Sequence, residues 1–429
     1  MSKIKNILFI MADQLRWDYL SCYGHPYLKT PNIDMLASKG VLFESSFVQS
    51  PICGPSRASF YTGRTVFSHG ATLNQVPIPI GELTIGDYLR KDNIKTAVVG
   101  KTHMKPDKDG MERLGLTKET DIGVIISEPG FDPYERDDGL HPNNWVKNYP
   151  TALSYNKWLN SLGYEGDNPW ETWANSSEGP NGELLSGWKL RNSNKKARIK
   201  EEHSETAYMT NRAIDFMKEN TNEQWMLHLS YIKPHWPYIA PAPYHNMYSP
   251  NQFYEVKRKE KEKNIEHEVY KAFTNAEVSK VFSRREVRES VITGYMGLIK
   301  QIDDNLGRLF EFMKTNKLFD NTMIVFTSDH GDYLGDHWLG EKELFHEQSV
   351  RVPLIIYDPS KTANLTRGRR EKKLVESIDL LPTFLEALSC STSTHRLEGN
   401  SLMPILQDRP IRKWRESVFS EIDYSLHSA

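Results

Sequence analysis

The segment from Pro51 to Ser59 combines a thiol, a tight turn and a guanidinium group in PICGPSRAS. Pro55 suits the first turn of a helix that would run to Gly63, so Cys53 is expected at or just before the helix N-terminus. Free backbone N–H groups there attract anions, and Arg57 adds a bidentate positive group. A thiol in this position has a lowered pKa and is reactive. A packing cysteine would need neither the turn nor the guanidinium, so we interpret Cys53 as a reactive residue.

Polar side chains also follow four separate apolar segments, at the point where each segment ends. The segments are 7–12, 96–99, 226–232 and 322–328. The side chains that follow them are Asp13, Gln14, Lys101, His103, Lys233, His235, Asp329 and His330. In a parallel sheet the carboxyl ends of the strands lie along one edge, where open α/β folds bind their ligands. We therefore expect these side chains to converge on one crevice.

Two of the strand ends offer ligands for a divalent cation, since Asp13-Gln14 and Asp329-His330 supply oxygen and imidazole groups. Carboxylate and amide oxygens favour Ca²⁺, Mg²⁺ or Mn²⁺, and the imidazole moves this preference slightly toward Mn²⁺. An aspartate after a strand most often caps a turn, which is how either aspartate alone would be interpreted. The two together, with lysine and histidine on the intervening strands, favour a metal site.

The elements that must position these residues alternate between short strands and helices. Thr30-Pro31 opens a helix that Gly40 ends, and Thr84 with Asp87 forms a capping box before another helix. Apolar residues spaced three or four apart over 287–309 predict a long helix. This alternation implies an α/β fold with a mainly parallel central sheet and helices on both faces. Residues 105–200, rich in Trp, Gly, Asn and Pro, are predicted to form an irregular insertion that shapes a substrate entrance.

The composition argues against several classes of protein. The 429 residues include 54 Lys+Arg and 56 Asp+Glu, a formal net charge of −2, which argues against a nucleic-acid partner. The first apolar segment is far too short to span a bilayer, and it meets Asp13 instead of a small-residue cleavage site. Three scattered cysteines fit a reducing compartment. We therefore expect a cytoplasmic protein that does not cross a membrane.

Several motifs resemble those of the sulfatase family. Cys53-Gly54-Pro55-Ser56-Arg57, followed by Thr62-Gly63-Arg64, resembles the signature C-x-P-S-R with T-G-R. Gly100-Lys101-Thr102-His103 resembles the family's G-K-x-H element. Further similar blocks follow in the family's order: Asp13-Gln14 at the start, then Lys233 to Pro237, Ser328 to Asp332 and Arg351-Val352-Pro353. The ordered set covers nearly the whole chain, to about Pro404, and is highly specific.

The resemblance implies an alkaline-phosphatase type of α/β fold and the hydrolysis of small-molecule sulfate esters. The family's signature cysteine is converted to formylglycine by a maturation enzyme, and Cys53 would be that residue. A hydrated aldehyde offers one hydroxyl as nucleophile and a second whose deprotonation expels sulfate and restores the aldehyde. By the same resemblance a divalent metal, Ca²⁺ before Mn²⁺ or Mg²⁺, would be held by Asp13, Gln14, Cys53, Asp329 and His330.

The resemblance also assigns roles to the remaining polar residues. Arg57, Lys101 and Lys342 would bind the oxygens of the transferred group. His235 would protonate the leaving oxygen, and His103 would act as the base in the elimination step. These two roles of the histidines could be exchanged.

Other features resemble the phosphonate monoester hydrolases, close relatives that also use formylglycine. The two metal-binding pairs carry Gln and His where many sulfatases carry Asp and Asn. Asn74, an expected substrate contact, and the segment 242–245 are also similar to these relatives. The Lys101 and His103 pair, in contrast, favours sulfate. The first interpretation is therefore a sulfatase; the alternatives are a phosphonate monoester or phosphodiester hydrolase and an inactive homologue that binds metal and anions.

The C-terminus is short compared with this family. The chain ends soon after residues 420–423, whereas family members usually continue into a small antiparallel subdomain. We expect a catalytic domain over residues 1–405 and only the start of a truncated or absent C-terminal subdomain over 406–429. Assembly into a homo-oligomer stays open.

Overall fold

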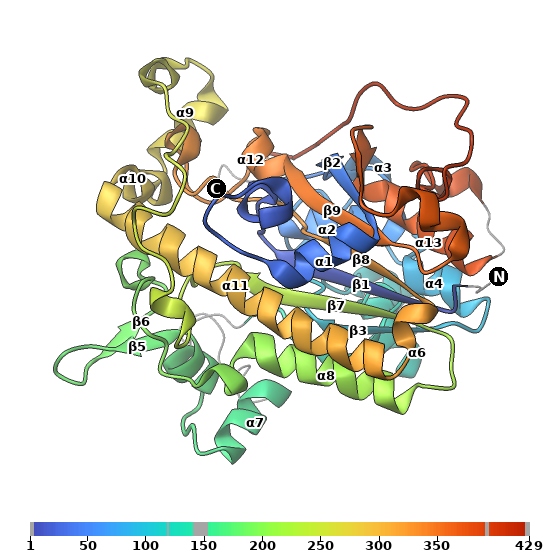
Figure 1. The fold of residues 1–429 in the computed structure, drawn as a ribbon, viewed down its shortest axis with the longest axis horizontal. Helices are drawn as coiled ribbons and strands as arrows, with labels where there is room; N and C mark the ends of the chain where they lie inside the picture. The colour runs from blue at the N-terminus through green and yellow to red at the C-terminus, as the bar shows by residue number, and fades with distance from the viewer. Residues whose placement is uncertain (1–3, 118–119, 140–152, 391–393, 425–429) are drawn as a thin grey trace.

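The computed structural model describes residues 4–117, 120–139, 153–390 and 394–424. Figure 1 shows a central sheet with helices on both sides. In these residues the main sheet has nine strands in the order β10-β2-β9-β8-β1-β7-β3-β4, with β11 paired to β2. The strands are β1 (Asn6–Asp13), β2 (Val41–Phe47), β3 (Lys95–Gly100), β4 (Asp132–Arg136), β7 (Trp225–Pro234), β8 (Thr322–Thr327), β9 (Arg351–Tyr357), β10 (Arg369–Glu371) and β11 (Val375–Glu376).

The four strands predicted to end in polar residues lie side by side. β8, β1, β7 and β3 are consecutive neighbours in the sheet and pair in parallel. Only β9 runs antiparallel, against β8 and β2, among the strand pairs described for this sheet. The predicted fold class is therefore confirmed, and the carboxyl ends of the four strands share one edge.

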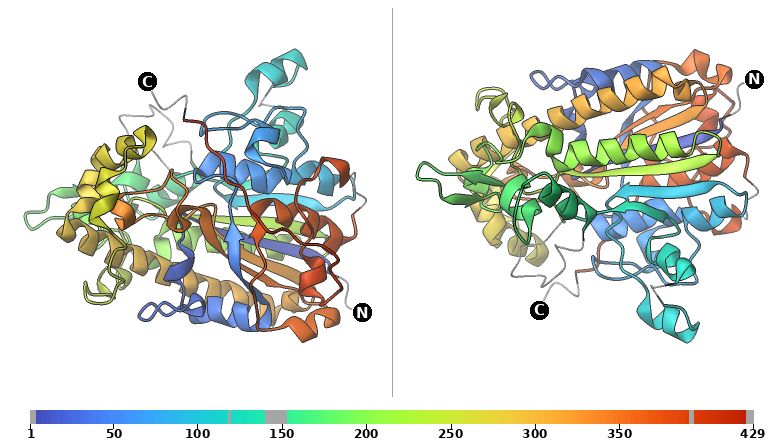
Figure 2. Two further views of the ribbon diagram at one scale, coloured as in Figure 1. Left: turned by 90° about the horizontal axis from the view of Figure 1, so that it is seen from above. Right: turned by 90° about the horizontal axis from the view of Figure 1, so that it is seen from below.

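Helices cover both faces of the sheet (Figures 1 and 2). One face carries α1 (Pro31–Lys39), α8 (Glu205–Glu219) and α11 (Arg285–Thr315), and the other carries α2 (Cys53–Thr62), α4 (Ile85–Arg90), α13 (Leu380–Leu388) and α14 (Met403–Leu406). Alternate residues of β1 enter two separate cores, Leu8 and Ile10 on the first face and Ile7 and Phe9 on the second. A strand buried on both faces explains the continuous apolar segment in the sequence.

The predicted helix starts are confirmed, with a difference in one cap. α4 has the capping box between Thr84 and Asp87. Thr30 precedes α1, but its side chain makes no cap hydrogen bond to that helix. Instead, Asp303 Oδ1 of α11 accepts two backbone N–H groups of the first turn of α1, at 3.0 and 2.9 Å. A carboxylate from another helix therefore satisfies the N-terminus of α1.

Residues 105–200 are more regular than predicted, within the part that the structure describes. They contain α5 (Lys108–Arg113), α6 (Asp121–Ser127), α7 (Ser154–Ser161) and a hairpin of β5 (Ser176–Glu178) and β6 (Leu184–Ser186). β4 also belongs to this segment and joins the main sheet parallel to β3. Its sequence, DPYER, has neither an apolar run nor a clear alternation, so periodicity could not identify it. Residues 118–119 and 140–152 lie outside the described residues.

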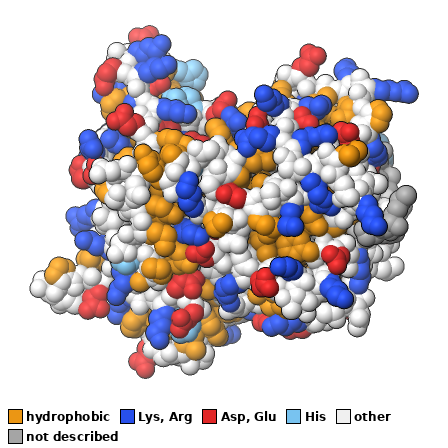
Figure 3. Space-filling view, in the orientation of Figure 1, with side chains coloured by type: hydrophobic (Ala, Val, Ile, Leu, Met, Phe, Trp, Pro, Cys, Tyr) orange, Lys and Arg blue, Asp and Glu red, His pale blue; other side chains and the backbone are white. Residues whose placement is uncertain are grey.

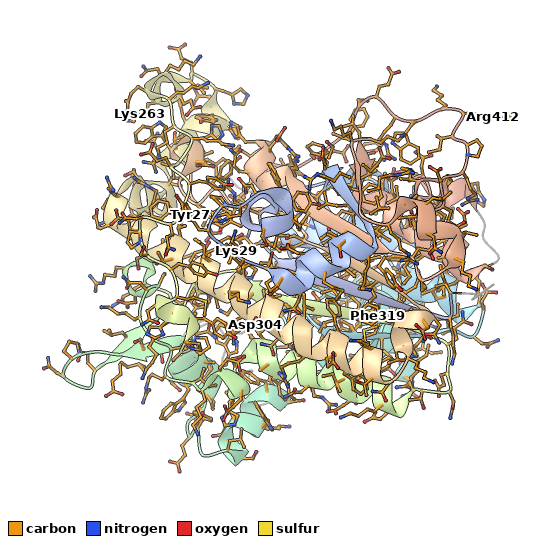
Figure 4. All side chains as sticks on the ribbon, in the orientation of Figure 1. Tyr27, Lys29, Lys263, Asp304, Phe319 and Arg412 are labelled. Carbon is orange, nitrogen blue, oxygen red and sulfur yellow. The ribbon has the colours of Figure 1, made fainter. Side chains whose placement is uncertain are left out.

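The surface is mixed in charge. On the face seen in Figure 3, acidic and basic side chains are interspersed. Lys263, labelled in Figure 4, is exposed in the charged segment before α9 (Glu268–Asn275) and α10 (Glu277–Ser283). Residues 409–424 are described without helix or strand. Arg415 connects them to the N-terminus of α13 through an ion pair with Asp379, the residue that precedes this helix. Among the described residues we find no helix that combines the length and apolarity needed to cross a bilayer.

Candidate active site

Cys53 is the first residue of α2, as the position of Pro55 predicts. The helix ends before Gly63, which adopts the left-handed conformation common at helix C-termini. All ten residues of α2 are buried. The Gly54 N–H donates to Asn74 Oδ1 at 2.8 Å, so Asn74 lies at the N-terminus of the helix beside Cys53. The sheet and this helix therefore hold the thiol inside the protein.

Four side chains from distant parts of the chain meet at this thiol. Asp13, Cys53, Asp329 and His330 each offer one ligand atom, and these atoms all lie within 4.8 Å of one another. Cys53 Sγ lies 3.0 Å from His330 Nε2. The same Nε2 lies 3.8 Å from one carboxylate oxygen of each aspartate. The parallel pairing of β1 and β8 places the two aspartates together.

The orientation of these groups fits a divalent cation. His330 Nδ1 lies 2.9 Å from the Gly331 carbonyl oxygen, which can only accept, so the Nε2 lone pair faces the cluster. Asp13 Oδ1 is buried and has no hydrogen-bond partner among the described residues, which is unfavourable unless a cation lies beside it. Oxygen ligands at about 2.3–2.6 Å from one Ca²⁺ are at most roughly 5 Å apart. The cluster satisfies this limit.

Gln14 is oriented by two neighbours that the sequence analysis missed. Its Nε2 donates to Asp332 Oδ2 at 2.5 Å and to the Tyr238 hydroxyl at 3.0 Å. Its Oε1 accepts from Lys342 Nζ at 2.7 Å. These bonds hold Oε1 toward Lys342 and fix which end of the amide faces the site. Asp332 belongs to the strand-end motif 328–332 and could have been identified there, whereas nothing in the sequence distinguishes Tyr238.

Buried cations surround the carboxylates. Arg57 Nε donates to Asp329 Oδ2 at 2.8 Å, and Arg57 Nη1 donates to the Lys101 backbone carbonyl at 2.7 Å. Lys101 Nζ forms an ion pair with Asp13 Oδ2. Arg57 Nη2 is buried and has no hydrogen-bond partner among the described residues, although it lies 3.6 Å from Asp13 Oδ2. A buried donor without a hydrogen-bond partner is expected where an anion binds.

The cations also shift the pKa of the acidic groups. Burial alone would raise the pKa of the Cys53 thiol, but Lys101 and then Lys342 outweigh burial and lower it well below the usual value. Burial likewise opposes ionisation of Asp13, and Lys101 is the main group that lowers the pKa of Asp13. The side chain at position 53 therefore lies in an electrostatic environment that favours an anion.

The two histidines predicted to transfer protons differ in their contacts. His235 Nδ1 lies 2.7 Å from the Trp236 carbonyl oxygen, so Nδ1 carries the hydrogen and Nε2 accepts from Lys342 Nζ at 3.2 Å. The His103 imidazole lies beside Cys53 and interacts with it electrostatically. Burial and then Lys101 lower the pKa of His103, which favours its neutral form. Both imidazoles therefore adjoin the cluster.

The contacts described above connect the residues predicted for the site, with the exception of Lys233. Its Nζ donates instead to Asn175 Oδ1 at 2.7 Å and to the Pro237 carbonyl oxygen at 2.8 Å. The connected residues come from the ends of β1, β3, β7 and β8, from α2, and from the loops that carry Asn74 and Lys342. Two histidines without a predicted role, His25 and His69, have structural partners instead. His25 Nδ1 accepts the Leu28 N–H at 2.9 Å, and His69 Nδ1 accepts the Ala71 N–H at 3.1 Å. The structure therefore separates the site from these other histidines.

Comparisons with known proteins agree with this geometry. Residues 5–390 match the family model Sulfatase. The chain is 32% identical to the multifunctional alkaline phosphatase superfamily protein PehA of Trinickia caryophylli, over 98% of this chain and 80% of that protein. It is 28% identical to an arylsulfatase of Clostridium perfringens, over 97% of this chain and 81% of that protein. Phosphonate monoester hydrolase SpPMH from Silicibacter pomeroyi has a similar structure, with a TM-score of 0.84 at 27% identity, over 98% of this chain and 80% of that chain. The chain therefore belongs to the sulfatase family.

Proposed function

We propose that the protein hydrolyses sulfate monoesters, using a formylglycine formed from Cys53 and a bound divalent cation. The observation that carries this proposal is the buried cluster of Asp13, Cys53, Asp329 and His330 with three cations around it. Members of the family generally use a metal and a formylglycine. The proposal implies two partners, a small-molecule sulfate ester and an enzyme that oxidises Cys53.

The site residues divide into those that hold the cation and those that hold the sulfate group. Asp13, Gln14, Asp329, His330 and residue 53 would hold the cation, and Ca²⁺ suits this mainly oxygen set best. The cation would lower the pKa of the attacking hydroxyl and neutralise charge on the sulfate oxygens, and the formylglycine would provide that hydroxyl from its hydrated aldehyde.

The chain's own cations would then bind the sulfate oxygens. Arg57 Nη2 has no hydrogen-bond partner among the described residues and would donate to one oxygen. Lys101 and Lys342, which lie beside Asp13 and Gln14, would donate to others. Donors held in place before the reaction stabilise developing charge without reorganisation, an effect typically worth several kcal/mol.

The histidines would move protons at defined atoms. His235 would deliver a proton from Nε2, since Nδ1 is bonded to a backbone carbonyl. Nε2 accepts from Lys342 Nζ in this structure, and it would carry that proton once Lys342 donates to a sulfate oxygen instead. That proton would go to the leaving oxygen. His103, neutral because its pKa is lowered, would take a proton from the side chain at position 53.

A second candidate function is the hydrolysis of phosphonate monoesters or phosphodiesters. Two phosphonate monoester hydrolases are structurally similar to this chain, with TM-scores of 0.84 and 0.82. The motifs that contain Gln14 and His330 also resemble those of the phosphonate monoester hydrolases. Lys101 and His103 support sulfate instead, because both contact the cluster and both belong to the sulfatase motif.

An aryl sulfate and an aryl phosphonate monoester with the same leaving group distinguish the two candidates. We expect kcat/KM to be at least ~10-fold higher for the sulfate, a difference of about 1.4 kcal/mol in transition-state stabilisation. A preference of ~100-fold for the phosphonate would reverse the assignment. If a preparation with formylglycine and bound metal hydrolyses neither ester, the inactive metal- and anion-binding homologue is the better description.

A further inference from the structure

The turn that carries His103 is held in a conformation that needs outside support. β3 ends at Gly100, whose φ of 105° is left-handed, and a Cβ at this position would clash with the Ser230 carbonyl oxygen. His103 also has a left-handed φ, of 57°. This region costs energy for a residue with a side chain, so the surrounding structure must stabilise it. The neighbouring strand β7 holds only the start of this turn, where the Ser230 carbonyl oxygen accepts the Lys101 N–H at 3.1 Å.

Asp138 holds the rest of the turn, at Thr102 and His103. Its Oδ1 accepts the backbone N–H of Thr102 at 3.1 Å and of His103 at 2.8 Å. Asp138 lies two residues after the end of β4, and Arg136 of β4 pairs with Gly100 at the end of β3. One carboxylate oxygen from the neighbouring strand therefore satisfies two consecutive donors of the turn.

A ring of charged groups fixes Asp138 in turn. Arg136 forms ion pairs with Asp138 and with Glu128, which directly follows α6. The Thr102 hydroxyl donates to Glu128 Oε2 at 2.9 Å and closes the ring. Burial opposes ionisation, but Arg136 outweighs it and lowers the pKa of Asp138 below its usual range. Asp138 therefore accepts as a carboxylate, and such charge-assisted bonds are stronger than neutral ones.

We propose that Asp138 is a positioning residue for His103, acting through the backbone of the turn without touching substrate. The His103 imidazole lies beside Cys53, so a change in the φ of His103 would move it away from the side chain at position 53. This inference rests on the proposed function, because a shift of His103 affects the rate only if His103 takes part in ester hydrolysis. An error of about 1 Å in the position of a reacting group can lower a rate ~100-fold.

Two substitutions separate the hydrogen bonds from the charge. D138A removes the acceptor, and we expect kcat to fall ~100-fold while KM changes less than about threefold. D138N keeps a carbonyl oxygen at Oδ1, and we expect it to retain within ~10-fold of the wild-type kcat. Rates are measured per molecule that contains aldehyde and metal. The matched control is D132A, which removes an exposed carboxylate from the other end of β4 and should keep the wild-type kcat.

A double-mutant cycle tests whether Asp138 acts through His103. In a protein that already carries H103A, adding D138A should change kcat by less than about threefold, because the group being positioned is gone. A further ~100-fold loss in that background would overturn the proposal, as would a wild-type kcat in D138A alone. A purely structural role would lower the yield of folded protein without this non-additivity.

Amide hydrogen exchange of residues 100–104 tests the turn without any turnover, in protein that retains the Cys53 thiol. We expect exchange of the Thr102 and His103 amides to be at least ~10-fold faster in D138A than in the wild type or D138N, because a hydrogen-bonded amide must open before it exchanges. Equal rates would overturn the proposal. If the wild type hydrolyses neither ester, the proposed function fails, and this measurement still decides whether Asp138 orders the turn.

Discussion

Cys53→Ala is expected to abolish ester hydrolysis while the protein remains folded. Conversion to formylglycine oxidises Cβ and replaces the thiol sulfur with oxygen, so the methyl group of alanine can become neither the aldehyde nor its hydrated nucleophile. Losing a nucleophile typically lowers kcat by roughly 10⁴-fold or more. The cost to folding is small, about 1–2 kcal/mol, because a single sulfur atom is removed and no ion pair of the carboxylates is broken. The measurements are kcat/KM on an aryl sulfate and the midpoint of urea unfolding.

Cys22→Ala is the matched control for this experiment. It makes the same chemical change at a half-buried cysteine, next to Asp34 and outside the cluster. We expect it to retain activity. The mass of the tryptic peptide that spans position 53, determined for the wild type, shows whether the thiol has become an aldehyde. Substantial activity in Cys53→Ala would remove the assignment of residue 53 as the nucleophile.

Asp329→Asn is expected to lose bound metal and activity together. Asp329 Oδ1 accepts the Gln14 and His330 N–H groups, each at 3.0 Å, and Oδ2 pairs with Arg57. Asparagine keeps the shape and one acceptor but removes the negative charge that a hard cation requires. We expect metal content, measured by inductively coupled plasma mass spectrometry, to fall at least ~10-fold, and kcat to fall ~100-fold or more.

Alanine at the same position is the less informative variant. It would leave Arg57 buried beside a cavity, and breaking a buried ion pair from one side typically costs about 3–5 kcal/mol. The matched control is Asp358→Asn, at a buried carboxylate that accepts from the Ser360 N–H and from Gln407 away from the site. It should keep both metal and activity. Full activity in metal-free Asp329→Asn would contradict the metal assignment.

The convergence of the site could be predicted because its signals are local. An apolar run followed at once by a polar pair is visible in a few residues, as at Ala12 and Asp13. The rule that parallel strands share an edge then brings such pairs together without further information. The sequence did not determine the strand order β8-β1-β7-β3, which depends on packing between residues far apart in the chain. The convergence nevertheless holds, since any order of these parallel strands gives the same edge.

The features that the sequence analysis missed depend on contacts between distant residues. Tyr238 orients Gln14 from a position that is 224 residues away, and Asp303 caps α1 from 270 residues away or more. Asp138 follows β4, a strand that could not be predicted because its sequence has no apolar run. In each case the side chain acts because tertiary packing places it beside a backbone or amide group. Local propensity carries no information about such partners.

The burial of Cys53, at 1% exposure, restricts when an enzyme can modify it. His330, whose Nε2 lies 3.0 Å from the thiol sulfur, follows Cys53 by 277 positions. At about 5–20 residues per second, a ribosome needs roughly 14–55 s to synthesise that stretch. During this interval β8 and His330 have not been synthesised, so they cannot yet cover the thiol. Under the proposed function, the oxidising enzyme would therefore act on Cys53 while the chain is still being made. Slower translation or delayed folding of the second half should then increase the fraction of mature protein.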